Sequence, residues 1–366
     1  MTPAPTGSHS QVPREPVTAV IDGWYAMLPG AADLRTALLR TPLTRRLPAP
    51  LVEGLMRMSL TRGLLLFAAS LVHPVVGVTR EFPGSGTLLL LRALFGRRRK
   101  LVVFQYIVHP RRHPLRRLLH AIDGWATRRA LRRGHALSRA DQSALARRYD
   151  MPEDRFAYVP WPLAKYPPDE LPPEPSEPLV LSAGRAHCDW PTLFAAAEGQ
   201  EWPLVVVCQR RDRRAVDRLN AGGRAVVHSE LPRDEFVALL RRATISVACM
   251  REGHTSQGHI RVMDGMTHGV AIVATATESL RGYVREGETG VLVPAGDVAR
   301  LRKAVGRLLG DPGERARLRE NAFAWAAGWQ VSDYFAALDD LLQDRPVLLP
   351  PAAPQAEPPT LGGVAR

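Results

Sequence analysis

The sequence has few cysteines, few lysines and no uninterrupted apolar stretch long enough to cross a bilayer, and each shortage argues against a class of protein. The three cysteines among its 366 residues are Cys188, Cys208 and Cys249, and no two of them have the C-x-x-C spacing. Their number and spacing indicate neither a zinc site nor a disulfide framework. A reducing cytoplasm is therefore the compartment we expect.

Segments that would enter a membrane are also missing. The longest apolar run, residues 63–78, is interrupted by His73 and Pro74, whereas a membrane-spanning helix needs about 20 apolar residues. Residues 1–16 hold no apolar core of a secretory signal. Like the Pro- and Ala-rich tail from 345 to 366, they are expected to be disordered.

The glycine fingerprint of dinucleotide-binding proteins is incomplete. Gly84 and Gly86 lie between a predicted strand and a predicted helix, but the third glycine of G-x-G-x-x-G is absent. We therefore interpret residues 83–86 as a turn, and a nicotinamide-dependent dehydrogenase is disfavoured.

Positive charge is abundant, and arginine supplies nearly all of it. The chain carries 49 basic and 36 acidic side chains, a net charge of +13. Residues 1–165 contain 26 of the basic and 10 of the acidic side chains, so the excess lies in the first half. Solvated helix faces explain such a pattern, but the runs of arginine also suit an anionic partner, either membrane lipid or an acidic acceptor. Nucleic acid is disfavoured because no recognised nucleic-acid-binding motif accompanies the charge.

Apolar strands alternate with helical segments along the chain, a pattern typical of parallel β-α-β architecture. The Pro-rich residues 161–178 read as a linker between an N-terminal domain at 17–160 and a C-terminal domain at 179–344. We predict an α/β fold of two Rossmann-like domains whose parallel sheets face each other across a cleft. The helices expected in the first domain include 31–39 and 115–131, and its strands include 75–79, 101–107 and 135–137.

The most informative stretch runs from 251 to 275. A polar loop at 255–258 precedes a helix from about His259 to His268, and a strand follows. Backbone N–H groups at the start of such a helix, capped by Ser256 or Thr255, suit a phosphate or a diphosphate.

Apolar residues surround this helix, so Asp264 within it is expected to be buried. A buried carboxylate needs a hydroxyl or a cation as its partner. An ordinary crossover helix, in which Asp264 caps a local group, is the alternative interpretation.

A second anion-seeking element follows the first strand of the C-terminal domain. Gly184 permits close approach of a ligand, and Arg185 offers two parallel donors to phosphate oxygens. Because carboxyl ends of parallel strands share one edge of a sheet, Arg185 and the loop at 255–258 are expected to lie on the same edge.

Three blocks of sequence together resemble the donor-binding half of the family 4 glycosyltransferases. They are Leu181-Ser-Ala-Gly-Arg185 followed by Asp189, then Ser256-Gln-Gly-His-Ile-Arg-Val-Met-Asp-Gly-Met266, and finally Gly287-Glu-Thr-Gly-Val-Leu-Val-Pro-Ala-Gly-Asp297. The resemblance covers about residues 135–343 in order and spacing. It implies the GT-B fold and transfer of a sugar from a nucleotide-diphosphate donor to an acceptor hydroxyl, with retention of configuration and without a metal or other cofactor.

The resemblance also implies roles for individual residues. The diphosphate would meet Gly184 and Arg185, and Asp264 would hold the ribose hydroxyls, since a carboxylate accepts from two vicinal hydroxyls. The remaining donor-binding candidates are Asp189, Ser256, Gln257, Gly258 and His259. The catalytic candidates are His109, which would lie over the transferred sugar, and Asp264. Gln105 and Tyr106 compete with His109 for that position.

Two departures from the family pattern leave a second function open. Ser256 stands where the family usually has its first motif glutamate, and no lysine follows Arg185 closely. The acceptor is expected to be a natural product, a polysaccharide or a lipid-linked molecule. The alternative is a catalytically silent, glycosyltransferase-like auxiliary protein. The chain is expected to be cytoplasmic, with peripheral association at an anionic membrane face as a further hypothesis.

Overall fold

The computed structural model divides into two compact units. One comprises residues 1–105, 112–134 and 339–346, and the other residues 106–111, 135–338 and 347–366. The structure describes residues 20–21, 32–33, 48, 50–51, 54, 58–72, 75–80, 84–96, 101–106, 115–162, 170–253, 256–347 and 349. The domain boundaries expected around the 161–178 linker stay a prediction.

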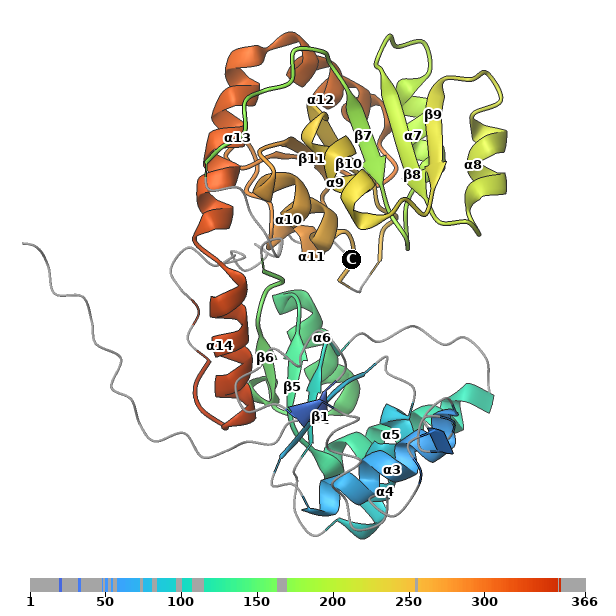
Figure 1. Ribbon diagram of the computed structural model, residues 1–366, viewed down its shortest axis with the longest axis vertical. Helices are drawn as coiled ribbons and strands as arrows, with labels where there is room; N and C mark the ends of the chain where they lie inside the picture. The colour runs from blue at the N-terminus through green and yellow to red at the C-terminus, as the bar shows by residue number, and fades with distance from the viewer. Residues whose placement is uncertain are drawn as a thin grey trace, which may run out of the picture. The chain divides into compact units, whose positions relative to one another are not determined.

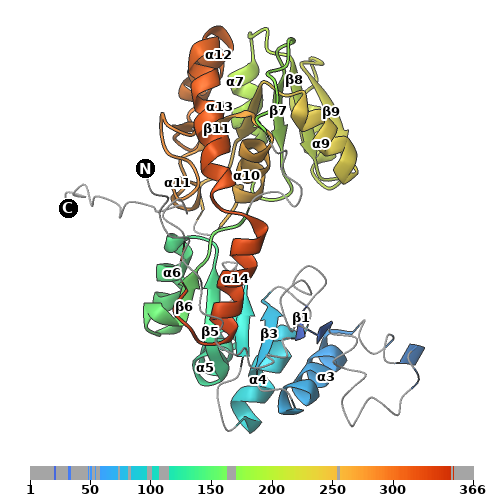
Figure 2. The same ribbon diagram turned by 60° about the vertical axis from the view of Figure 1, so that its left-hand side comes forward.

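The first half of the chain builds a sheet of four strands in the order β3-β4-β5-β6, in which β3, β4 and β5 are parallel. Helix α4 contacts both α3 and α5, and Figure 2 shows it between them. The elements are β1 (Val20–Ile21), β2 (Ala32–Asp33), α3 (Ser59–Val72), β3 (Val76–Thr79), α4 (Ser85–Phe95), β4 (Leu101–Phe104), α5 (Leu115–Ala130), β5 (Leu131–Ala136), α6 (Arg139–Tyr149), the short 3₁₀ helix η2 (Glu153–Arg155) and β6 (Phe156–Tyr158).

Two predictions in this half are wrong. Ala32 and Asp33, expected in a helix, form a parallel strand pair with β1, because strand pairing overrides local propensity. Strand β5 begins at Leu131, four residues before the predicted start. Its two arginines are tolerated in a strand because Asp344 pairs with both, Arg132 at 3.1 Å and Arg133 at 3.4 Å.

The larger unit contains a sheet of six parallel strands in the order β12-β11-β10-β7-β8-β9. Its strands are β7 (Val180–Ala183), β8 (Leu204–Cys208), β9 (Ala225–Ser229), β10 (Ile245–Ala248), β11 (Ala271–Thr275) and β12 (Val291–Val293). Its helices are α7 (Trp190–Ala197), α8 (Arg213–Leu219), α9 (Arg233–Arg241), α10 (His259–Thr267), α11 (Glu278–Arg281), α12 (Val298–Gly310), α13 (Pro312–Ala327) and α14 (Val331–Leu342), the last of which reaches the smaller unit.

Both faces of the six-stranded sheet are covered, which explains its continuous apolar strands. Helices α7 and α12 pack on one face, whereas α9 packs on the other, next to α10 (Figures 1 and 2). Every residue of β8, β10 and β11 is buried. Strands buried on both faces read as apolar runs rather than as alternating patterns. The prediction of two α/β units with parallel sheets is confirmed.

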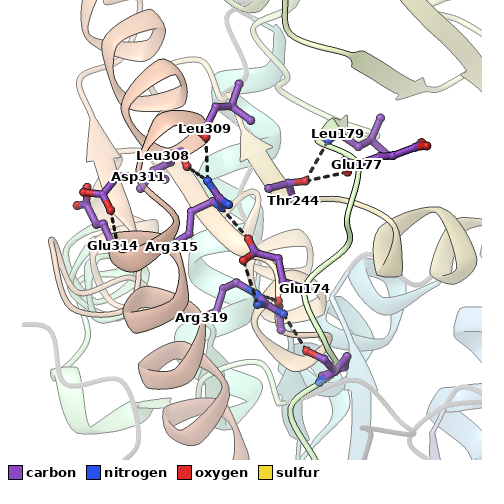
Figure 3. Close-up of polar contacts among 12 residues, drawn as sticks. Glu174, Glu177, Leu179, Thr244, Leu308, Leu309, Asp311, Glu314, Arg315 and Arg319 are labelled. Atoms are coloured by element: carbon purple, nitrogen blue, oxygen red, sulfur yellow. Dashed lines mark hydrogen bonds and ion pairs between the residues drawn. The ribbon is translucent and has the colours of Figure 1, made fainter.

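A buried ion-pair cluster fixes the segment that leads into β7 (Figure 3). Arg315 of α13 donates from Nε to Glu174 Oε1 at 2.6 Å and from Nη1 to the Leu309 carbonyl at 2.9 Å, at the C-terminal end of α12. Arg319, one turn further along α13, donates to the Pro172 carbonyl at 2.8 Å and to the Gly269 carbonyl. Both guanidiniums therefore satisfy backbone acceptors that the fold leaves without strand or helix partners.

None of the helices in the described part of the chain is long and apolar enough to cross a membrane.

Arg315→Ala tests the contribution of this cluster. We expect it to lower the free energy of unfolding by about 2–4 kcal/mol, because the change leaves the Leu308 and Leu309 carbonyls without their charged donor and leaves Glu174 with the more distant guanidinium of Arg319, at 3.9 Å. Chemical denaturation measures the loss. The matched control is Arg307→Ala, which removes an exposed pair with Glu314 and should cost less than about 1 kcal/mol. Equal losses in the two variants would contradict the assignment.

Candidate functional site

Two loops meet at the carboxyl edge of the six-stranded sheet. They follow β7 and β10, which are neighbouring parallel strands. The Asp189 amide donates to the Cys249 carbonyl at 2.9 Å, and the Arg251 amide donates to the His187 carbonyl at 2.8 Å. The two anion-seeking elements inferred from the sequence are therefore joined by backbone hydrogen bonds.

Gly184 begins the first loop, and its lack of a side chain is required there. A Cβ atom at this position would lie 2.1 Å from the Cys188 Sγ atom. Cys188 itself is buried, and burial raises the pKa of its thiol to about 12. The thiol thus acts as a packing group that keeps the backbone of the loop close to the sheet edge.

A pocket of about 110 Å³ opens at this edge, beside the first turn of α10. Three arginines from three segments line it: Arg185 after β7, Arg233 at the start of α9 and Arg261 in the first turn of α10. The other lining residues are Gly184, Val207, Cys208, Gln209, Glu230, Leu231 and Phe236.

Asp264 is buried and is held by two of these arginines. Arg233 donates to its two carboxylate oxygens at 2.9 and 2.8 Å, and Arg261 donates to Oδ2 at 3.3 Å. Asp264 is 4% exposed, so the cation expected as its partner is present. The hydrogen bonds from Asp264 raise the pKa of Arg233, whereas burial lowers the pKa of Arg261, which lies 4.4 Å from the centre of the Phe236 ring.

The pocket carries more positive than negative charge. Glu230 pairs at 3.3 Å with Arg210, which is not one of the three arginines that line the pocket. Arg185 is exposed, and within the described residues no hydrogen-bond acceptor or carboxylate contacts its guanidinium. One carboxylate, Asp264, therefore faces two guanidiniums while a third is free to bind an anion.

The N-terminus of α10 differs from the expected cap. Gly258, with a φ of 79°, occupies the N-cap position, and among the described residues no side chain caps the helix. Of the two predicted caps, Ser256 does not cap the helix, because it binds Asp141: the Ser256 amide donates to Asp141 Oδ1 at 3.2 Å, and its hydroxyl donates to Oδ2. Thr255, the other predicted cap, lies outside the described residues.

Two buried polar atoms beside this helix start have no partner within the described residues. They are Oε1 of Gln257 and Nδ1 of His259. The amide of Gln257 donates to the Arg251 carbonyl at 2.8 Å, and the His259 ring stacks on Tyr283 at 5.5 Å. Buried groups of this kind are commonly satisfied by a bound ligand or by water.

Asp141 is a residue that the sequence interpretation missed. It lies in the first turn of α6 and also accepts from the hydroxyl of Ser138, the N-cap of that helix, at 2.8 Å. Burial raises the pKa of Asp141, against the hydrogen bonds from Ser256 and Ser138, which lower it. The spacing Ser-x-x-Asp predicts a capped helix, but nothing in it indicates a contact with a loop 115 residues away.

The other predicted site residues lie in separate places. Asp189 caps α7, accepting from the Thr192 amide at 3.3 Å and from its hydroxyl at 2.7 Å. His109 lies outside the described residues, whereas its competitors Gln105 and Tyr106 directly follow β4. Arg233 also escaped prediction, since 31 residues separate it from Asp264. The contact of Arg261 with Asp264 could have been predicted, because a basic and an acidic residue three apart on a helix lie side by side.

Most of the residues that line the pocket lie in a region that is similar to known proteins. Residues 189–311 match the family model for glycosyl transferases group 1. The D-inositol 3-phosphate glycosyltransferase of Acidothermus cellulolyticus is 36% identical over 96 residues, which make up 26% of this chain and 20% of that protein. The chain thus matches about a fifth of the length of this relative.

Solved structures agree over a longer span. The Anabaena protein HepE in complex with UDP and glucose superposes with a TM-score of 0.63 at 14% identity, covering 90% of this chain and all of that one. Sucrose-phosphate synthase from Thermosynechococcus elongatus has a TM-score of 0.60 at 19% identity, covering 77% and 78% of the two chains. Identities this low show the fold alone, which is that of GT-B glycosyltransferases.

Two buried histidines in the same unit predict acid destabilisation. Burial lowers the pKa of His135 and of His259 to about 4, whereas an unfolded histidine titrates near 6.5. Between those values the unfolded chain binds protons that the folded chain does not. The free energy of unfolding should therefore fall as pH drops from about 6.5 towards 4, by up to about 1.4 kcal/mol per pH unit for each histidine.

Denaturation curves recorded at pH 7, 6 and 5 measure this slope. His259→Asn should reduce the slope without abolishing it, because burial also lowers the pKa of His135 and of His268. Asp141 opposes the effect, because a raised carboxyl pKa in the folded state stabilises the fold as pH falls. A stability that stays level between pH 7 and 5 would contradict the assignment.

Proposed function

We propose that this protein is a glycosyltransferase of the hexosyltransferase type that moves a sugar from a nucleotide-diphosphate donor to an acceptor hydroxyl. The pocket at the edge of the six-stranded sheet supports this proposal most directly. Its three guanidiniums suit the two negative charges of a diphosphate, and arginine forks match phosphate oxygens in geometry. The glycosyl transferases group 1 match, at residues 189–311, includes Arg233 and Arg261 of this pocket.

In the proposed reaction, the bond between the anomeric carbon and the diphosphate breaks as the acceptor oxygen binds that carbon. The leaving diphosphate takes the electron pair and finally the acceptor proton, so no strong general base is required. Arg185 and the N–H groups at the start of α10, from Gln257 to His259, would stabilise the developing negative charge. His109 is proposed to lie over the transferred sugar. Retention of configuration and independence from metal and other cofactors belong to the same proposal.

Arg233 and Arg261 can supply the positive charge that the family pattern places on a lysine after Arg185. The lysine expected after Arg185 is missing, but both arginines line the pocket that Arg185 lines. A cation supplied from α9 or α10 can neutralise a phosphate as well as one supplied from the loop, because the requirement is for charge at the pocket wall. The proposed enzyme therefore has the required positive charge at the pocket, supplied by arginines in place of the lysine.

Asp264 has a proposed role in two states. Without donor, it neutralises Arg233 and Arg261. When a diphosphate binds those guanidiniums, carboxylate oxygens are released to accept from the ribose hydroxyls. This exchange keeps every buried charge paired in both states, which a low-dielectric site requires.

The proposal also covers the acceptor, the cellular location and the first donors to test. The acceptor is a natural product, a polysaccharide or a lipid-linked molecule, and the chain acts in the cytoplasm, with peripheral association at an anionic membrane face. The Anabaena structure contains UDP, which makes uridine nucleotides the first donors to test.

Arg185→Ala and Arg261→Ala test the diphosphate site. Each should weaken binding of UDP about tenfold to a hundredfold, because a charge-assisted hydrogen bond contributes about 1.5–3 kcal/mol. Calorimetric titration measures the affinity. Arg214→Ala, an exposed position on α8, is the control and should bind UDP as the wild type does. Unchanged affinity in both pocket variants would reject the site.

Asp264→Asn distinguishes contacts with the ribose from contacts with the phosphates. We expect UDP to bind about tenfold more weakly, since an accepting carboxylate is lost, while inorganic pyrophosphate binds at least as tightly because two guanidiniums lose their competitor. Sugar transfer from UDP-sugars should fall in parallel with UDP affinity. A variant in which both ligands weaken equally would show that Asp264 only maintains the shape of the pocket.

A further inference from the structure

Helix α3 presents apolar side chains on two opposite faces. Leu65, Leu66 and Ala69 are buried against the rest of the unit. On the other face, Leu60 is 63% exposed and Leu71 is 57% exposed, with Leu64 between them at 47%. At 100° per residue these three leucines lie within about 40° of one another, so they form one exposed row.

The exposed row continues onto α4. Phe67 lies on the same side of α3, one turn after Leu64, and its ring centre is 6.2 Å from that of Phe95. Phe95, the last residue of α4, is 67% exposed. We call the surface formed by Leu60, Leu64, Phe67, Leu71 and Phe95 the α3–α4 patch. Single exposed leucines are common, but contiguous exposed rows of this kind mark interaction sites.

The charge of the sequence around the patch indicates an anionic partner. Residues 59–134 contain 15 basic and 2 acidic side chains, a balance of +13, and the rest of the chain holds 34 of each sign. The whole net charge of the protein therefore lies in the segment that carries the patch. Such a segment attracts an anionic surface from a distance set by the ionic strength.

Described arginines bring that charge to the patch itself. Arg129 of α5 is exposed and donates from Nε to the Ala93 carbonyl at 2.6 Å, two residues before Phe95. The neighbouring Arg128 is also exposed. Helix α5 adds its own exposed apolar side chains, among them Trp125 at 40%, and tryptophan is a residue enriched at membrane interfaces.

Helix α3 fits a position along an interface rather than across it. Its 14 residues extend about 21 Å, less than the about 30 Å of a bilayer core. An apolar face flanked by arginines is the pattern of helices that lie in the plane of a membrane surface.

We propose that the α3–α4 patch docks on a membrane surface that contains anionic lipid, with the leucines and phenylalanines entering the headgroup region and the arginines binding the lipid phosphates. A second copy of the chain suits the patch less well, because two segments of charge +13 would face each other. Nucleic acid would use the arginines but not the exposed leucines. The docking does not depend on the donor pocket and can be measured without any transfer reaction.

Flotation of the full-length protein with lipid vesicles tests the proposal. At about 0.1 M salt the wild type should float with vesicles of equal parts phosphatidylcholine and phosphatidylglycerol, and should not float with phosphatidylcholine alone. Raising the salt to about 0.5 M should weaken the binding, because screening shortens the reach of the charges.

The decisive variant is Leu60→Gln with Leu64→Gln, which should lower the partition coefficient at least tenfold while the thermal melt and UDP affinity stay unchanged. Its matched control replaces two exposed apolar residues of the larger unit, Leu219→Gln with Val226→Gln, and should float as the wild type does. Equal flotation of the two double variants, or no flotation of the wild type, overturns the proposal. Sedimentation that shows a wild-type dimer and a monomeric Leu60→Gln, Leu64→Gln variant would assign the patch to a second copy instead.

Discussion

The backbone hydrogen bonds between the loops that follow β7 and β10 are the contact on which the rest of this site depends. Because β7 and β10 are adjacent and parallel, their carboxyl ends reach the same edge of the sheet, and the amides of Asp189 and Arg251 join the two loops there. Arg185 is thereby held beside the first turn of α10, which supplies Arg261. A parallel sheet with its crossover helices makes such an edge wherever two neighbouring strands end. What this sequence adds is an unusual concentration of guanidinium groups.

Charge balance governs how that edge behaves. Asp264 is nearly inaccessible to solvent, yet it holds two arginines that line the pocket. Removing a buried charge from its partner is costly, so a ligand can displace one member of this set only by replacing its charge. An anion with at least two negative charges meets that condition, whereas a neutral sugar does not. Under the proposed function, phosphate groups would therefore be recognised ahead of the sugar or the base. Arg185, the arginine without a carboxylate partner in the described chain, would be their first contact.

Much of this arrangement follows from the sequence, and the exceptions have physical reasons. The apolar runs of β8, β10 and β11 and the glycine at position 184 are local features, so the parallel sheet and its ligand edge could be predicted from them. The contacts of Asp264 with Arg233 and of Ser256 with Asp141 join residues far apart in the chain, and no periodicity encodes such pairs. Serine and threonine usually cap helices, so the sequence predicts Ser256 or Thr255 as the cap of α10; the buried Asp141 carboxylate binds Ser256 instead. Strand β5 was predicted to start too late because its arginines look unlike strand residues until their partner, Asp344, is known.

We thus propose two separate recognition surfaces, one at the arginines around Asp264 in the larger unit and one at the arginines around the exposed apolar row of α3 and α4. Recognition of a diphosphate by the larger unit is the central proposal. Calorimetric titration of the wild type with UDP and with UMP, each at about 0.05 M and 0.5 M salt, tests it most directly. The account predicts that UDP binds at least tenfold more tightly than UMP at low salt and that the difference shrinks at high salt, as expected for charge pairing. Equal affinities for UDP and UMP at both salt concentrations would contradict it.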